Sequence, residues 1–337
     1  MSSTEMNSMT KDTAPEASAA GAERNGDRAI VQVRGLTKAY DDALAVSDVT
    51  FDVPEGEIFG FIGPNGAGKT TTLRIIATLL EPTAGEVKID GLCVENDTDD
   101  VRRIIGYMPD HFGVYEGITV FEYLEFFASA YRITGARRSA MISDVMELTD
   151  LQRLRDRMVS TLSKGMKQRL CLAKTLVHDP KVLILDEPAS ALDPRARIEM
   201  RVLLKELGRM GKTIIISSHI LTELSDLCSS VAILERGKLL GCGKVDLLSR
   251  KQWSAAQVRI TLHAPHPAVP SILGANGVVQ NVEVEGAEVR FEYSGSPEDF
   301  HKVLKTLTDA EVPVLSVEQD ARDLENLFLE LTRGDVQ

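Results

Sequence analysis

The chain has 337 residues, of which 43% are hydrophobic and 26% are charged, and its formal net charge is -12 at pH 7. This length accommodates one large domain and a small one. The acidic balance argues against a nucleic-acid partner, because phosphate backbones require clustered Lys and Arg. The four cysteines lie far apart without C-x-x-C spacing, so the sequence indicates neither a disulfide framework nor a zinc site.

Residues 1–28 form the first distinct segment. They are rich in Ser, Ala, Glu and Asp and have no apolar core, so we predict a disordered tail and not a signal peptide. No stretch of the sequence approaches the roughly 18 consecutive apolar residues that a membrane helix requires. Since the cysteines indicate no disulfide framework, we expect a cytoplasmic protein.

A phosphate-binding loop is predicted at residues 63–70. The pattern G-x-x-x-x-G-K-[ST] is matched by Gly63, Pro64, Asn65, Gly66, Ala67, Gly68, Lys69 and Thr70. An apolar run at 57–62 predicts a buried strand before the loop, and the apolar spacing at 71–80 predicts a short helix after it. Glycines let backbone N–H groups turn around an anion, and the helix N-terminus adds partial positive charge. An ordinary glycine-rich turn would need neither the lysine nor the hydroxyl.

Three side chains at this loop have expected roles. Lys69 should reach the β- and γ-phosphates of a nucleotide, the Thr70 hydroxyl should bind Mg²⁺, and Thr71 should contact the α-phosphate. A triphosphate site also needs a second metal anchor and a group that activates water.

Two adjacent carboxylates meet that need. Residues 181–185 form a short apolar run, typical of a central parallel strand, and Asp186 and Glu187 follow it directly. Ligands of open α/β sheets bind at the carboxyl ends of the strands. Asp186 is therefore placed to hold Mg²⁺, directly or through water, and Glu187 to take a proton from the attacking water. A solvated acidic turn is the alternative, but it explains only one of the two carboxylates.

A histidine follows a third predicted strand. Residues 213–218 have the pattern of a buried strand, and His219 comes next. We predict that His219 hydrogen-bonds the γ-phosphate. A lone histidine is more often a satisfied structural residue, so this interpretation depends on the other motifs.

In the order of these motifs, residues 30–245 resemble the nucleotide-binding domain of ATP-binding-cassette (ABC) proteins. The resemblance implies ATP as the nucleotide and a P-loop NTPase fold of the α/β class, with a mixed sheet core, an antiparallel β subdomain and a helical subdomain. The antiparallel sheet is expected to include residues 30–34 and 46–53. The helical subdomain is expected at about 99–173, within a nucleotide-binding domain that spans 29–246.

The resemblance also implies that residues 162–166 are the family's signature segment. Lys164 and Met166 stand where many members carry Gly and Gln. Ser163 can cap the helix that starts at about Gln168, and Gly165 lets backbone N–H groups face an anion. In the family that anion is the γ-phosphate held by the opposite subunit. A simple helix cap is the alternative.

Two further residues take expected roles from the family. Tyr40 matches the aromatic residue that stacks on adenine, although stacking alone does not distinguish ATP from GTP. Residues 190–193 resemble the loop that crosses between subunits. Asp193 and Pro194 also fit a helix N-cap followed by proline at the first helical position, so a structural role for Asp193 is the alternative.

Asp110 departs from the family pattern. Most members place a glutamine there that touches the metal and the lytic water, and no glutamine occurs between Gln32 and Gln152. Aspartate is shorter, and when ionised it cannot donate a hydrogen bond, but it can bind Mg²⁺. We predict that Asp110 keeps the metal-sensing role with altered geometry.

Residues 110–131 concentrate the aromatic side chains and are the predicted docking region for a transmembrane permease subunit. Thr119 and Glu122 form a capping box, which predicts a helix from Val120 through Tyr131. The face expected to be core contains Phe121, Leu124, Phe127 and Ala128. The aromatic residues expected to receive a short helix of the permease are Phe112, Tyr115 and Tyr123. Packing inside the helical subdomain is the alternative.

Residues 247–337 are predicted to form a small α+β domain. Strands are expected at 257–262, 278–284, 287–293 and 314–317, and helices at 297–307 and 324–331. The domain lacks a paired nucleophile and base, so it is not interpreted as a second enzyme. Dimer contact or regulation is its functional interpretation, and a stabilising appendage is the alternative.

This domain, the turn at 107–110 and residues 324–328 are similar to the ATPase subunits of bacterial ABC-2-type exporters for drugs, antibiotics or lipids. The resemblance implies a homodimer, or a pair with a paralogous ATPase subunit, that binds two ATP molecules and drives a separate permease at the inner face of the cell membrane. A soluble ABC ATPase acting on a protein assembly is the alternative function. An inactive ATP-binding scaffold has Asp110 as its only support. The sequence specifies neither the transported substrate nor the direction of transport.

Overall fold

The computed structural model describes residues 28–41, 43–111, 113–190, 192–220, 224, 226–245 and 256–319. The predictions for the tail up to residue 27, for Phe112 and for the helix at 324–331 lie outside these residues.

A six-stranded sheet forms the centre of the first domain. Its strands run in the order β10-β9-β3-β8-β7-β6, and all are parallel except β10. The strands are β3 (Ile58–Ile62), β6 (Ile105–Met108), β7 (Val182–Leu185), β8 (Thr213–Ser218), β9 (Ser230–Glu235) and β10 (Lys238–Lys244). Every residue of β7 and β8 is buried, as expected for parallel strands covered on both faces. The predictions for these strands and for β3 are confirmed.

An antiparallel sheet forms a second layer, with the strand order β2-β1-β4-β5. Its strands are β1 (Ala29–Tyr40), β2 (Ala43–Pro54), β4 (Ala84–Ile89) and β5 (Leu92–Cys93). β1 and β2 are much longer than the predicted 30–34 and 46–53. Register shifts interrupt their pairing, and Gly35 in β1 has φ of 57°, so the alternation of apolar residues that marks a strand is broken there.

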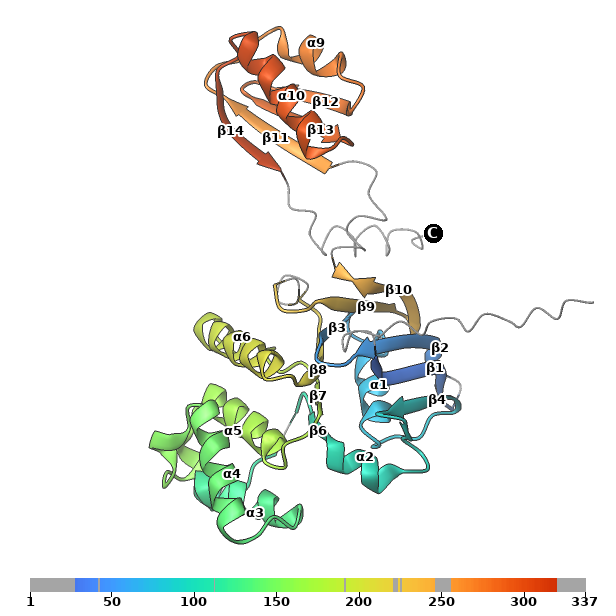
Figure 1. The fold of residues 1–337 in the computed structure, drawn as a ribbon, viewed down its shortest axis with the longest axis vertical. Helices are drawn as coiled ribbons and strands as arrows, with labels where there is room; N and C mark the ends of the chain where they lie inside the picture. Colours follow the sequence, from blue (N-terminus) through green and yellow to red (C-terminus); the bar gives the residue numbers. More distant parts are fainter. Residues whose placement is uncertain are drawn as a thin grey trace, which may run out of the picture.

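Helices cover the other face of the central sheet (Figure 1). They are α3 (Val120–Ala130), α4 (Gly135–Leu148), α5 (Lys164–Leu176) and α6 (Pro194–Arg209), with short 3-10 turns η1 (Gln152–Leu154) and η2 (Val159–Thr161). The predicted capping box is confirmed, since Thr119 Oγ1 accepts from Glu122 N and Glu122 Oε2 accepts from Thr119 N. The expectation of a mostly helical segment at 99–173 missed β6. This strand follows α2 (Thr98–Ile104) and is only four residues long, too short to show a period of its own.

The central sheet is therefore buried between two apolar cores. Leu183 and Leu185 of β7 belong to the core shared with α3 to α6. Val182 and Ile184 belong to the core shared with the antiparallel sheet and α1 (Lys69–Ile76). This alternation fixes the register of β7, because a slip by one residue would exchange the two faces.

The C-terminal part has a core of its own, built on a sheet of order β12-β13-β11-β14. Its elements are β11 (Ala256–Leu262), α9 (Val269–Gly274), β12 (Val279–Glu285), β13 (Glu288–Tyr293), α10 (Pro297–Asp309) and β14 (Val314–Gln319). The expected hairpin joins β12 to β13, and a capping box at Ser296 and Asp299 starts α10. The short helix α9 was not predicted, since six residues give too few turns for a helical period.

The separate core of the C-terminal part predicts independent stability. Phe291 is 2% exposed, and Phe291→Ala should lower the free energy of unfolding of this part by about 3–5 kcal/mol, because it removes a ring and leaves a cavity. Hydrogen exchange should then accelerate within 256–319 and not within 28–245. Leu315→Ala is the control, since Leu315 is 64% exposed and should matter little. Faster exchange throughout the chain would contradict an independent core.

Candidate active site

The predicted site residues meet at one edge of the central sheet. The loop after β3 contains Lys69 at its end, Asp186 and Glu187 follow β7, and His219 follows β8. β3, β8 and β7 are neighbours and parallel, so their carboxyl ends lie together. A cavity of about 730 Å³ at this edge is lined by the loop, by Glu187 and His219, and by Asp110 beyond β6.

Two glycines of the loop are required by its backbone. A Cβ on Gly63 would lie 2.4 Å from the carbonyl oxygen of Leu234. Gly68 has φ of 100°, and a Cβ there would lie 2.6 Å from the carbonyl oxygen of Ala45. The loop can therefore pass close to neighbouring strands only with glycine at both positions. Gly68 precedes the first residue of α1, so the N-terminus of this helix faces the loop.

Lys69 is almost enclosed. Its Nζ donates to the carbonyl oxygens of Gly63, at 2.6 Å, and Pro64, at 3.2 Å. It also lies 3.6 Å from Glu187 Oε1, and the side chain is 6% exposed. Burial lowers the pKa of Lys69, while the Glu187 carboxylate opposes that shift. The ammonium group is therefore held beside the loop by fixed oxygen atoms.

Asp186 is a buried carboxylate with one uncommitted oxygen. It is 1% exposed, and its Oδ1 accepts from Thr70 Oγ1 at 3.2 Å and from Ser217 Oγ at 2.7 Å. Its Oδ2 has no hydrogen-bond partner among the described residues. Burying a carboxylate oxygen without a partner costs folding free energy unless a bound ligand interacts with it. The adjoining Thr70 hydroxyl gives the same position a second hard oxygen, the donor type that Mg²⁺ prefers.

Glu187 has an unusual backbone and two cationic or hydrogen-bonding neighbours. Its φ is 49°, in the left-handed region, and its backbone N donates to Ser217 Oγ at 2.9 Å. His219 Nδ1 lies 2.8 Å from Glu187 Oε2, and since a carboxylate accepts, Nδ1 carries the proton. Lys69 Nζ lies near the other oxygen, Oε1, so each carboxylate oxygen of Glu187 has a nitrogen neighbour. An ionised carboxylate is the form that a general base requires.

Asp110 lies at the rim of the same cavity. Its side chain is 37% exposed, and Oδ2 is 2.8 Å from His111 Nδ1. Asp110 therefore lies at the same cavity as the phosphate loop and Glu187. It is more exposed than Asp186.

The comparisons with known proteins agree with this geometry. Residues 46–190 match the family model described as ABC transporter. A Nod factor export ATP-binding protein I of Burkholderia pseudomallei is 34% identical over 302 residues, which covers 90% of this chain and 96% of that protein. The chain belongs to the ATP-binding subunits of ABC transporters. The linearmycin resistance ATP-binding protein LnrL of Bacillus subtilis is 30% identical, with 90% of this chain and 98% of that protein covered.

Among solved structures, a dimeric ATP-binding cassette in a post-hydrolysis state, bound to ADP and phosphate, aligns with a TM-score of 0.58. The two sequences are 29% identical, and the alignment covers 64% of this chain and 98% of the solved chain. The predicted fold class and family are therefore confirmed. This ABC ATPase binds ATP and hydrolyses it to drive transport.

In this ATP-binding subunit, the segment predicted to be the signature, residues 162–166, forms the cap of α5. Ser163 Oγ accepts from Met166 N at 3.3 Å and starts α5, four residues earlier than the predicted start at Gln168. Ser163 and Gly165 line a cavity of about 410 Å³ that does not include Lys69. Asp193 lines that second cavity too, and it caps α6 by accepting from Ala196 N at 2.9 Å. Lys164 lines both cavities, so the two adjoin, but within one chain Ser163 and Gly165 do not line the cavity that contains Lys69.

Tyr40 does not line the cavity of the phosphate loop. It ends β1, is 45% exposed, and lies 5.3 Å from Lys38 Nζ, measured to the ring centroid. Its predicted stacking on adenine stays a prediction for this ATPase.

Two polar side chains beside the predicted site residues were not predicted from the sequence. Ser217, within the apolar β8, bonds Asp186 and the backbone of Glu187. Gln168 Nε2 donates to Pro188 O at 2.5 Å and lines the cavity of the phosphate loop. Ser217 had one signal, since a hydroxyl inside an otherwise apolar parallel strand needs a partner.

Ser217→Ala should slow ATP hydrolysis by about tenfold, because it removes a hydrogen bond to a buried charge and frees two neighbouring groups to shift. Phosphate release at saturating ATP measures the effect. Ser218→Ala is the matched control, since the Ser218 hydroxyl bonds only the Ile220 backbone among the described residues. Equal rates in the two variants would remove Ser217 from the positioning role.

Proposed function

We propose that two copies of this chain, or one copy and a paralogous ATPase subunit, close around two ATP molecules and power a separate ABC-2-type export permease. One observation carries the proposal: Ser163 and Gly165 do not line the cavity that contains Lys69, although the two cavities of one chain adjoin at Lys164. A site that needs both groups is complete only when the signature of a second subunit covers the phosphate loop. The dimeric solved cassette with ADP and phosphate supports this arrangement.

Within each site, different residues of this chain bind the phosphates and accept the proton. The loop and Lys69 bind the β- and γ-phosphates, and His219 contacts the γ-phosphate. The His219 ring donates Nδ1–H to Glu187, and this hydrogen bond fixes the orientation of the ring at the cavity. Glu187 accepts the proton of the attacking water.

Mg²⁺ fits Thr70 and Asp186. The uncommitted Asp186 Oδ2 and the Thr70 hydroxyl supply two oxygen donors. No group of three or more His, Cys, Asp or Glu side chains forms a metal cage in the described parts of the chain. This matches a cation that takes its other ligands from substrate phosphates and water. When bound, Mg²⁺ neutralises developing charge on the phosphates. Asp110 is the third residue proposed as a ligand of Mg²⁺.

The permease is proposed to dock near residues 110–131. Two aromatic rings there face solvent: Tyr115 is 57% exposed and Phe126 is 52% exposed, with their centroids 5.5 Å apart. The inclusion of Tyr123 in this surface was wrong, because Tyr123 is 1% exposed and packs in the core beneath Tyr115 and Phe127. Phe126 takes its place.

In the residues that the structure describes, no helix has the length and apolarity to cross a bilayer. The proposal places this subunit at the cytoplasmic face of the cell membrane, held there by the permease. The names of the two full-length relatives refer to Nod factor export and linearmycin resistance. Export is proposed for this chain on the strength of that relationship.

Glu187→Gln should leave ATP binding intact and slow hydrolysis by about 10²-fold or more, because the amide cannot accept the proton of water. Phosphate release measures hydrolysis, and size-exclusion chromatography with ATP and Mg²⁺ should show accumulated dimers. Glu206→Gln, at an exposed position of α6, is the matched control. Rapid turnover in Glu187→Gln would exclude Glu187 as the base.

Asp110→Ala should lower Mg²⁺-dependent hydrolysis by roughly 10-fold to 100-fold, as expected for a group that orients a metal or its water. Asp110→Gln keeps an oxygen and adds a donor, so it should retain much more activity. Rates measured across a Mg²⁺ titration distinguish the two variants. If hydrolysis by Asp110→Ala and its coupling to transport were unchanged, the metal-sensing role would be wrong.

A further inference from the structure

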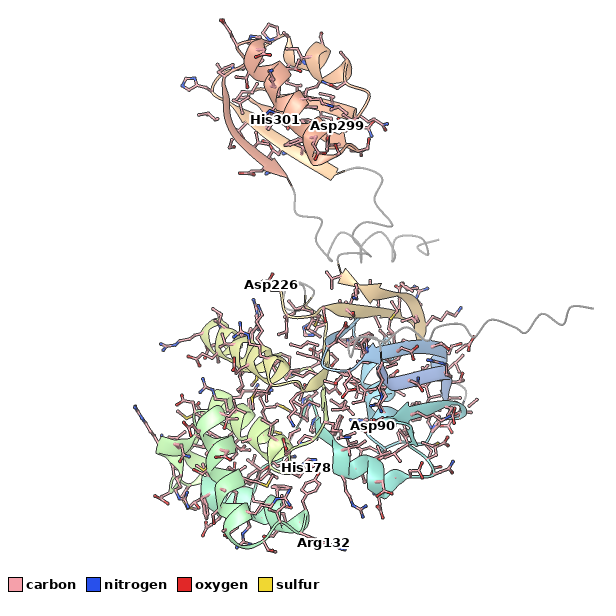
Figure 2. All side chains as sticks on the ribbon, in the orientation of Figure 1. Asp90, Arg132, His178, Asp226, Asp299 and His301 are labelled. Atoms are coloured by element: carbon pink, nitrogen blue, oxygen red, sulfur yellow. The ribbon has the colours of Figure 1, made fainter. Side chains whose placement is uncertain are left out.

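A basic cavity lies outside the ATPase site. Its volume is about 290 Å³, and it opens between α2, the connection from α3 to α4, and the segment after α5. Its lining includes three arginines and no carboxylate: Arg103, Arg132, Arg137, Tyr131, Thr134 and His178. A cavity lined by three arginines and by no carboxylate is unexpected on a chain with a net charge of -12. Figure 2 shows Arg132 and His178 at this end of the helical region.

Two of the guanidinium groups have no partner in the described parts of the chain. Arg103 pairs with Asp100 one turn earlier on α2. Arg132 and Arg137 make neither an ion pair nor a side-chain hydrogen bond among the described residues. The adjacent Arg138 is fully engaged, with Glu125 at 3.0 Å and Ser129 at 3.0 Å. The positive charge at Arg132 and Arg137 is therefore left available to a ligand.

The backbone fixes Arg132 at a cost. Its φ is 58°, and its N–H donates to Ser129 O at 2.9 Å just beyond the end of α3. Helices commonly end with a residue in this left-handed conformation, which is usually glycine and sometimes asparagine. A long charged residue is uncommon in this conformation. In this conformation Arg132 lines the cavity.

His178 lines the cavity, and one of its ring nitrogens has no hydrogen-bond partner among the described residues. Its ring stacks on Tyr131 with centroids 3.8 Å apart and an interplanar angle of 4°. Nε2 lies 2.7 Å from Ile105 O, so Nε2 carries the proton and Nδ1 is a lone-pair acceptor. Nδ1 is buried and has no hydrogen-bond partner in the described structure.

We propose that this cavity binds a phosphate group, presented by an anionic lipid headgroup or by a small soluble phosphate compound. Forked guanidinium donors match the several oxygens of a phosphate, and Arg binds such groups better than an isolated point charge does. The N-terminus of α4 adds partial positive charge, since its cap residue Thr134 makes no side-chain capping bond and its first turn has no acidic residue. The site is separate from the phosphate loop and shares no lining residue with it.

The test compares two double variants of the full chain. Arg132→Gln with Arg137→Gln removes two charges from the cavity. Arg209→Gln with Arg290→Gln removes the same charge elsewhere, from positions paired with Glu206 and Glu288. The active site is kept saturated with ADP and Mg²⁺, so that the phosphate loop does not bind the probe. Two probes are used: phosphatidylcholine vesicles with and without phosphatidic acid, assayed by sedimentation, and pyrophosphate, assayed by calorimetry.

The cavity variant should lose affinity for at least one probe by about tenfold or more, because charge-assisted hydrogen bonds contribute strongly to anion binding. The control variant should stay within about twofold of the unmodified chain. ATP hydrolysis without a probe should be unchanged in both. An effect confined to phosphatidic acid vesicles identifies a lipid headgroup, and one confined to pyrophosphate identifies a soluble ligand. Equal affinities of the cavity variant and the control for both probes would overturn the proposal.

Discussion

The parallel alignment of β3, β8 and β7 is the constraint on which the ATPase site depends. Each strand end delivers one component: the phosphate loop, His219, or Asp186 with Glu187. Because parallel neighbours end at the same edge, groups separated by more than a hundred residues in the sequence lie within hydrogen-bond reach. The two apolar cores on either face hold the strands in register and so set these distances. A buried sheet thereby supports a polar site at its edge.

The sequence predicted the parts of this site whose chemistry is local. The phosphate loop needs glycines and a lysine in a short run, and the carboxylates follow an apolar run. Both patterns can be recognised in the sequence without knowing which strands lie next to each other in the sheet. The full length of β1 was hidden by bulges, and β6 is too short to show a period. Ser217 acts through a contact with the next strand, which no local pattern describes.

The aromatic segment shows the same limit from another side. Its capping box and the position of α3 were predicted, because both depend on residues three or four apart. Which rings face solvent was not, since Tyr123 is buried by a neighbouring helix while Phe126 is left open. Amphipathic spacing locates a helix, but only the packing of α3 against α4 and α5 decides how wide its buried face is.

The left-handed backbone at Glu187 has an evolutionary consequence. Asparagine, aspartate and glycine tolerate this conformation at low cost, whereas valine, isoleucine and threonine do not. Divergence at this position can therefore replace the carboxylate that we propose as the base by asparagine or glycine without straining the turn between β7 and α6. Such a variant would keep the phosphate loop and the strand ends in place and would lose only the carboxylate.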